Sequence, residues 1–501
     1  MAEDLKTQFN TAFNFHKEGN LDEAENLYTE ILSKDDKNAE VWNLLGMVNM
    51  QKFRLTKAKE CIEKAISITP NPYFFENIAK VYLEMEDSEN AIELYTELLK
   101  VKPNNFDYLF NLASAYKLAH NNEKAIECYK RAGELNPNNP DTFYNLGLIY
   151  DNLGMPKKSV EYYNKALEIT PEDMETRYFT GLAYFKNRDY KNGLPFFESR
   201  LCKQSALMTQ VQTYPNLVRT APVWEGEDIS DKTLYTYYEA GFGDVLMFSR
   251  YIPFLKERCK KLIFKPQAPL VELLEYNFPD VEFQKYFVNE QEMKFDYHIP
   301  FLSVPYVLGL DENNGMFTGK SGYLKADTNI VQRYKSEYFN NNKFKIGIKW
   351  RGNTHYEMDR VIDIKSFIKL FDIPETKFYS FQTFEGAEDL NEIINDYDIV
   401  DIGKTVTNFA DTAGALENMD LIICNDTSLV HLAGAMNKPC WVLLPYLYNW
   451  RWHLDLNKCD WYDSVKLYRQ KTVGDWDEIF DRMKKDLQMI VKKTPKNPQK
   501  H

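Results

Sequence analysis

A short polar cluster has the residue types that bind an anion: Asp426, Thr427, Ser428 and His431. The first three follow an apolar run at 421–424 and belong to types that cap helices, and His431 lies four residues after Thr427, on the same helix face. The N–H groups at a helix start and its partial positive charge form a site for phosphate. The cluster therefore predicts a phosphate site, with plain helix capping as the alternative.

Asp244 is a second candidate, because it follows the turn formed by Gly241, Phe242 and Gly243 at the end of a strand-like segment at 233–240. A carboxylate at this place can cap the next helix or act as a general base. The two glycines allow a ligand to approach the backbone closely. The third glycine of the dinucleotide-binding pattern is missing, which argues against NAD.

Arg351 is a third candidate, because it comes directly after a predicted strand at 344–350, in a loop that also carries Asn353, His355 and Arg360. A guanidinium group matches the oxygens of a phosphate. We therefore expect Arg351 and Asn353 to contact the same ligand as the polar cluster. An exposed structural arginine is the alternative.

The elements that position these residues alternate between strand and helix from residue 233 onward. The polar cluster lies between predicted strands at 421–424 and 440–444, joined by a helix. We also expect short strands at 261–266, 295–301, 321–326, 377–382 and 399–402, and helices at 245–259, 267–277, 385–394, 411–419 and 475–493. Asp411 or Thr412 would cap the helix at 411–419. Two successive α/β regions predict two facing Rossmann-like halves with a cleft between them.

The first two hundred residues form a different pattern, an internal repeat. Ala24, Ala58, Ala91, Ala125 and Ser159 occupy equivalent places at steps of 34, 33, 34 and 34 residues. Aromatic residues and prolines recur with them at fixed offsets, which is the tetratricopeptide (TPR) pattern. The repeats predict an α-solenoid of five to six helix pairs whose aromatic residues form its core. A protein or peptide in its groove is the expected partner; a purely structural spacer is the alternative.

Composition excludes several other classes of protein. The net charge of −13 makes nucleic acid an unlikely partner. Seven scattered cysteines give no disulfide or zinc pattern. The start MAEDLKTQFN lacks the apolar segment of a secretory signal, and no apolar run approaches the roughly 18 residues of a transmembrane segment, so we expect a cytoplasmic protein. Asp396 and Asp398 form an Asp-x-Asp that we interpret as turn chemistry and not as a metal site.

Several ordered motifs together resemble a TPR protein carrying a glycosyltransferase domain of the heptosyltransferase family, glycosyltransferase family 9. They are EAGFGDVLMFSRYIP, IGIKWRGNTHYEMDR, DTAGALENMDLIICNDTSLVHLAGAMNKPCWVLLP, NWRWHLD and DWYDSVKLYRQKTVGDW. The resemblance spans roughly residues 222–489, in addition to the repeats. It implies a GT-B fold, in which two Rossmann-like domains bind a nucleotide-diphospho-sugar donor, mainly through the C-terminal domain.

The resemblance also implies roles for individual residues. Asp244 matches the aspartate proposed to deprotonate the acceptor hydroxyl, and Asp426, Thr427 and His431 match the donor-binding cluster. The family inverts the anomeric carbon and uses neither a metal nor a cofactor, since the nucleotide sugar is a substrate. From repeats and resemblance together we predict a TPR array at 1–205, a linker at 206–230, two transferase halves at 231–342 and 343–490, and a basic tail at 491–501.

Two alternatives remain open at this point. The chain could be a non-enzymatic TPR scaffold with a degenerate transferase half. Two departures favour this slightly: Arg360-Val361, where the family usually has arginine-serine, and Asn449, where it usually has an aspartate. It could instead be a protein O-glycosyltransferase similar to the TPR-bearing O-GlcNAc transferases, which share the domain order. Binding of nucleotide sugars would separate the scaffold from the two enzymes.

Overall fold

The computed structural model describes residues 2–202, 221–285, 294–352, 360–447, 449–454 and 459–493. The chain divides into two compact units, Met1–Thr176 and Arg177–His501. No helix within the described residues is both long enough and apolar enough to cross a bilayer, and the cytoplasmic location stays a prediction.

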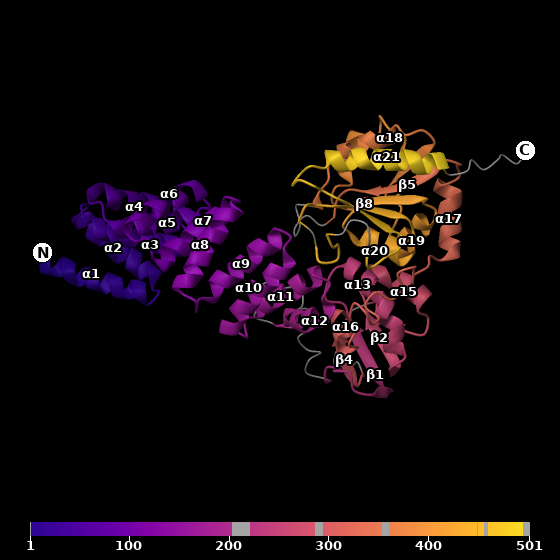
Figure 1. Cartoon of the computed structure of the whole chain (residues 1–501), viewed down its shortest axis with the longest axis horizontal. Helices are drawn as coiled ribbons and strands as arrows, with labels where there is room; N and C mark the ends of the chain where they lie inside the picture. Colours follow the sequence, from indigo (N-terminus) through magenta and orange to yellow (C-terminus); the bar gives the residue numbers. More distant parts are fainter. Residues whose placement is uncertain are drawn as a thin grey trace, which may run out of the picture. The chain divides into compact units, whose positions relative to one another are not determined.

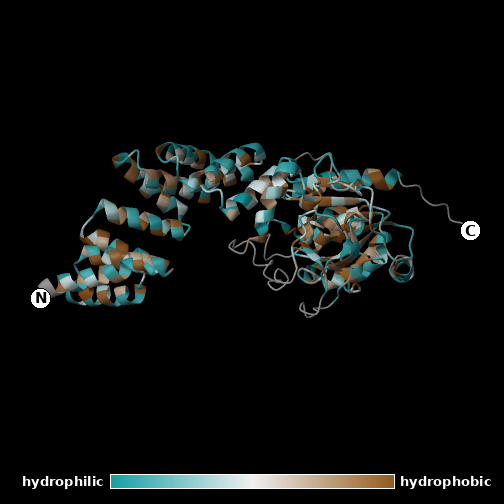
Figure 2. Cartoon of the chain, turned by 90° about the horizontal axis from the view of Figure 1, so that it is seen from below, coloured by the Kyte–Doolittle hydropathy of each residue, from teal (hydrophilic) through white to brown (hydrophobic). Residues whose placement is uncertain are grey.

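The first unit is a solenoid of antiparallel helix pairs (Figure 1). Its helices are α1 (Ala2–Lys17), α2 (Leu21–Lys34), α3 (Ala39–Gln51), α4 (Leu55–Ile68), α5 (Pro72–Glu84), α6 (Ser88–Val101), α7 (Phe106–Leu118), α8 (Asn122–Leu135), α9 (Pro140–Asn152) and α10 (Pro156–Ile169). Figure 2 shows that these helices carry both hydrophilic and hydrophobic residues, as expected of helices with one face turned to a neighbour.

The turn inside each helix pair repeats the same backbone conformation. One residue per turn has a positive φ: Gly19, Phe53, Glu86, His120, Gly154 and Arg188. These residues follow one another at 33 or 34 residues, so the structure confirms the solenoid and shows that the first and sixth repeats have the same turn as the others.

Small and aromatic residues fill the space between the solenoid helices, as the repeat pattern predicts. Tyr28, Tyr95, Tyr129 and Tyr163 are completely buried. The Tyr163 ring lies against Gly147, where a Cβ atom would come within 2.5 Å of it. The aromatic residues are therefore core and do not form a binding surface.

The second unit begins inside α11 (Met174–Lys186), which is followed by α12 (Tyr190–Phe197). Although these helices form the sixth repeat, Phe185, Tyr190 and Phe197 belong to the main apolar core of the α/β unit. The division thus differs from the predicted array end at residue 205, because the apolar side chains of the sixth repeat pack against the α/β elements. Most of the predicted linker, residues 206–220, lies outside the described residues; in its remaining part Trp224 is buried and β1 starts at Ile229.

The first sheet of this unit is parallel, with the order β3-β2-β1-β4. Its elements are β1 (Ile229–Tyr237), α13 (Phe242–Phe248), α14 (Ile252–Lys256), β2 (Cys259–Lys265), α15 (Val271–Asn277), β3 (Glu282–Phe283), β4 (Tyr297–Pro300) and α16 (Val304–Val307). The predicted strand at 321–326 is wrong. The N–H groups of Tyr323 and Leu324 instead donate to the carbonyl oxygen of Ala435, so this segment lies beside the end of the helix at Ser428–Ala435.

The second sheet is also parallel and has six strands in the order β10-β9-β8-β5-β6-β7. Its elements are α17 (Thr328–Tyr338), β5 (Phe344–Lys349), α18 (Ile368–Phe371), β6 (Thr376–Ser380), β7 (Ile399–Asp401), α19 (Phe409–Glu417), β8 (Leu421–Asn425), α20 (Ser428–Ala435), β9 (Cys440–Leu444), β10 (Val465–Arg469) and α21 (Asp477–Lys493). Helices α18 and α21 cover one face, and α19 and α20 cover the other (Figure 1). This is the doubly wound Rossmann order, which reverses between β5 and β8.

The fold class predicted from the sequence is confirmed, an α-solenoid followed by a GT-B-like pair of Rossmann-like domains. Local details differ. Asn408 caps α19 by accepting a hydrogen bond from the N–H of Asp411, at 2.9 Å, so neither Asp411 nor Thr412 is the cap. The segment 385–394 contains only a 3-10 helix, Glu388–Glu392.

Candidate active site

The predicted phosphate cluster lies at the point where the strand order of the second sheet reverses. Strands β5 and β8 are neighbours, so the loops after Lys349 and Asn425 leave the same edge of the sheet. The two loops touch, because a Cβ atom at Gly352 would lie 3.0 Å from Cγ2 of Thr427. Ligands of doubly wound folds bind in the crevice at such a reversal. The fold therefore places Thr427 and Ser428 where a ligand is expected.

Among the described residues, no side chain caps the backbone N–H groups at the start of α20. Thr427 precedes the helix in an extended conformation, but its hydroxyl does not cap the first turn; it makes only a long contact of 3.4 Å to the carbonyl oxygen of Asn425. Thr427 and Ser428 are partly exposed. An uncapped helix start that solvent can reach suits an anion.

Asp426 is buried and neutralised by Arg360. Its carboxylate lies 3.1 Å from Nη1 of Arg360, which also donates to the carbonyl oxygen of Asp426 at 3.2 Å. The side-chain amide of Asn425 in turn donates to the carbonyl oxygen of Arg360, at 2.9 Å. Asp426 therefore fixes the loop after β5 to the loop after β8, and its charge is offset by Arg360 next to the predicted phosphate site.

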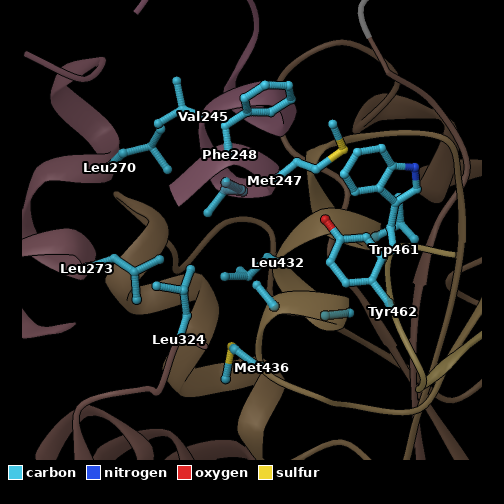
Figure 3. Packing of buried hydrophobic residues seen from close by; sticks show 14 of the residues in the cluster. Val245, Met247, Phe248, Leu270, Leu273, Leu324, Leu432, Met436, Trp461 and Tyr462 are labelled. Carbon is cyan, nitrogen blue, oxygen red and sulfur yellow. The ribbon is translucent and has the colours of Figure 1, made fainter. Parts of the chain in front are cut away.

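His431 joins the two halves of the unit. It is only 4% exposed, its Nδ1 lies 3.0 Å from the hydroxyl of Tyr462, and its ring stacks on Trp452 at 5.5 Å. On the opposite side lies Gly243, where a Cβ atom would come within 2.8 Å of Cδ2 of His431. Gly243 thus allows α13 of the first half to approach α20 of the second. Figure 3 shows apolar residues of both helices, among them Val245 and Leu432, in the same cluster.

Asp244 lies beside this contact, in the first turn of α13. Its Oδ2 accepts a hydrogen bond from the N–H of Gly241 at 3.1 Å, so Asp244 caps its own helix, and its Oδ1 pairs with Arg451. The guanidinium of Arg451 also donates to Oδ1 of Asn449 at 2.9 Å and lies over the Trp450 ring at 4.5 Å. The structure therefore brings Asp244 and His431, 187 positions apart in the sequence, to one place.

The Arg351 side chain forms an ion pair with a carboxylate. Its Nη2 lies 3.2 Å from Oδ2 of Asp389, and its stem packs against Gly386. The loop is held by Gln382, whose Oε1 accepts a hydrogen bond from the N–H of Arg351 at 3.0 Å. Arg351 thus lies at the correct edge of the sheet but pairs with Asp389, and Asn353 lies outside the described residues.

Matches to family models agree with this architecture. TPR models match residues 39–72, 74–105, 121–154 and 140–173. The model described as glycosyltransferase family 9 (heptosyltransferase) matches residues 377–443, from β6 to β9, and thus includes the cluster at 426–431. The chain combines tetratricopeptide repeats with a family 9 glycosyltransferase segment.

Similarity to individual proteins extends over parts of the chain. The uncharacterized protein ycf37 of Pyropia yezoensis is 34% identical over 68 residues, which are 13% of this chain and 38% of that protein. Three solved structures match about a third or more of the chain. They are YrrB, described as a TPR protein with an unusual peptide-binding site (23% identity, 34% of this chain, 88% of that chain, TM-score 0.31), MamA from Desulfovibrio magneticus RS-1 (19%, 34%, 96%, 0.32) and a tetratricopeptide repeat protein from Parabacteroides merdae (18%, 42%, 84%, 0.38).

Four residues beside the candidate site had no role predicted from the sequence: Arg360, Arg451, Trp452 and Tyr462. Arg451 and Trp452 lie in the NWRWHLD motif, which marked the family but carried no role. Their partners lie on other elements, and only the folded chain brings them together. The sequence contains one signal for these residues, the position of Arg451 between Trp450 and Trp452.

A pH dependence of stability follows from the burial of His431. Burial lowers the pKa of His431 to about 3, and the nearby Arg451 acts in the same direction. Because the unfolded chain binds this proton near pH 6.5, stability is complete above that value and falls as the pH drops from 6.5 towards 3. At pH 5 the loss is about 2 kcal/mol.

Urea unfolding at pH 7 and pH 5 would check this expectation. Tryptophan fluorescence reports mainly the second unit, since every tryptophan except Trp42 lies there. The loss should shrink in His431→Gln and persist in His120→Gln, a change at an exposed repeat turn. An equal loss in both variants would contradict the assignment to His431.

Proposed function

We propose that the chain is an inverting, metal-independent glycosyltransferase that moves a sugar from a nucleotide-diphospho-sugar to an acceptor hydroxyl. One observation carries the proposal: Asp244 of the first Rossmann-like half lies next to His431 and the start of α20, at the reversal of the second sheet. A carboxylate beside a phosphate site is the arrangement that such a transfer needs.

The donor diphosphate would bind at the start of α20. Thr427 and Ser428 would present N–H groups and hydroxyls to its oxygens, and the helix dipole would favour its charge. Arg360 offsets the charge of Asp426, so that carboxylate does not repel the diphosphate. Arg351 would contribute if its pair with Asp389 opened. These groups support a leaving diphosphate without a metal, which is the basis for proposing metal independence.

Asp244 would act as the general base. The acceptor oxygen attacks the anomeric carbon, its proton passes to the Asp244 carboxylate, and the bond between that carbon and the diphosphate breaks with its electron pair on the leaving group. Attack opposite the leaving group inverts the anomeric carbon. Arg451 holds the carboxylate in place through its ion pair, and the low pKa of His431 keeps that neighbour neutral.

The repeats of the first unit would bind a protein or peptide that serves as acceptor or recruits it. The same arrangement fits a protein O-glycosyltransferase, which would be recognised by sugar on a bound protein. The scaffold alternative predicts that no nucleotide sugar binds.

Calorimetry with the full chain and ADP-, GDP- and UDP-sugars tests donor binding, and EDTA should leave it unchanged. Ser428→Glu provides the sharpest variant, because an acidic residue in the first turn stabilises a helix but repels a diphosphate. We expect a loss of affinity of roughly 100-fold, since two charges near 4 Å interact strongly at a partly buried site.

Ser88→Glu is the matched control, because Ser88 is the first residue of α6 in the solenoid and is also partly exposed. It should leave donor affinity unchanged. Equal donor affinity in wild type and Ser428→Glu would rule out the start of α20 as the diphosphate site.

A further inference from the structure

The loop after β6 holds an aromatic side chain in solvent at the same sheet edge. Phe384 is 93% exposed and has a φ of +54°. Both features are unfavourable: a fully exposed phenylalanine forgoes the burial that stabilises it, and a bulky residue rarely adopts a positive φ. Strained residues of this kind gather at functional sites.

The loop that carries Phe384 is held firmly by Gln382. The buried side chain of Gln382 accepts hydrogen bonds from the N–H groups of Trp350 and Arg351, at 3.2 and 3.0 Å. It donates to the carbonyl oxygens of Arg351 and Glu385, at 3.0 and 2.8 Å. Four bonds from one side chain thus join the loops after β5 and β6, and Phe384 keeps its place between Gln382 and Glu385.

A chain of contacts connects this loop to the proposed diphosphate site. Thr427 touches Gly352, and Arg351 packs against Gly386, two residues after Phe384. Strands β8, β5 and β6 are consecutive in the sheet, so the ends of β8 and β6 are about 10 Å apart. That separation is comparable to the reach of a nucleoside diphosphate from its phosphates to its base.

We propose that the Phe384 ring is the platform on which the base of the nucleotide-sugar donor stacks, a proposal that rests on the proposed function. An exposed flat ring on the loop against which Arg351 packs recognises a planar base, because every base has a π-face. Phe53 shows that exposure and positive φ occur elsewhere, in a repeat turn. The position of Phe384 at the ligand edge is what distinguishes it.

The test compares a probe that has a base with one that lacks it. The full chain is titrated with ADP, GDP, UDP and inorganic pyrophosphate. Phe384→Ala should weaken binding of the preferred nucleoside diphosphate by roughly 10- to 100-fold and leave pyrophosphate binding unchanged. Phe384→Tyr should retain the wild-type affinity. Since Phe384 is exposed, the unfolding midpoint of Phe384→Ala should equal that of wild type.

Phe53→Ala is the matched control, being 83% exposed with a φ of +54° in the solenoid. Phe53→Ala should change neither the affinity for nucleoside diphosphates nor the affinity for pyrophosphate. Unchanged nucleoside diphosphate affinity in Phe384→Ala would overturn the inference while leaving the proposed function intact. If wild type binds none of the three nucleotides, the proposed function fails, and the inference fails with it.

Discussion

Asp244→Asn is expected to lower the rate of sugar transfer by about 10²- to 10⁴-fold, which is the range for loss of a general base. An asparagine fits the same space and can still accept the hydrogen bond from the N–H of Gly241. It cannot accept a proton from the acceptor. Donor binding should persist, because the groups at the start of α20 are unchanged. The measurement is release of nucleoside diphosphate from the donor that binds best, together with calorimetry of donor binding.

The control for this variant is Asp280→Asn. Asp280 belongs to the same half of the unit, is exposed, and pairs with Lys256 at the surface. Such a pair contributes little, so transfer and stability should remain near wild type. A wild-type rate in Asp244→Asn would show that another group accepts the proton. No release from any nucleotide sugar by wild type would instead favour the scaffold.

Arg200→Met is expected to destabilise the second unit by about 3–5 kcal/mol, because it leaves a buried carboxylate without its partner. Arg200 donates to both oxygens of Glu239, at 3.1 and 2.8 Å, and to Oγ of Ser303 at 2.7 Å. Both side chains of the ion pair are at most 4% exposed. Burial raises the pKa of Glu239, which Arg200 counteracts. Urea unfolding followed by tryptophan fluorescence measures the loss.

Two further variants distinguish the loss of the Arg200–Glu239 ion pair from a nonspecific loss of stability. Adding Glu239→Gln removes the orphaned charge, so the double variant should be more stable than Arg200→Met alone. Arg188→Met breaks a pair with Asp460 in which Arg188 is 41% exposed, and should cost no more than about 1 kcal/mol. A similar loss of stability in Arg188→Met and Arg200→Met would show that burial does not determine how much each ion pair contributes.

The features that could be predicted from the sequence are those with local signals. The repeats appear because one structural unit recurs every 33 or 34 residues, and each turn in the structure falls at that spacing. The start of α20 was also visible, since an apolar strand, a run of capping residues and an apolar helix follow one another directly. In both cases neighbouring residues contain the whole signal.

The features that could not be predicted depend on distant partners. Asp244 and Arg451 are 207 positions apart, and no local pattern links them. The packing of the sixth repeat likewise depends on distant partners: α11 and α12 have the spacing of a repeat, and Phe185 packs against Trp450 at 5.1 Å. Arg351 was predicted to contact a phosphate, which stays a prediction. Its ion pair with Asp389, which follows a different strand, could not be predicted from the sequence.

The division of the chain within α11 determines which repeats could be exchanged for another array during evolution. Residues 2–169 form helix pairs that pack on one another, so a recombination event upstream of α11 could replace them with a longer or shorter array. A crossover after Arg200 would remove Tyr190 and Phe197 from the core of the α/β unit and leave Glu239 without its ion-pair partner. The sixth repeat therefore belongs with the α/β elements, and only the repeats upstream of it could vary independently.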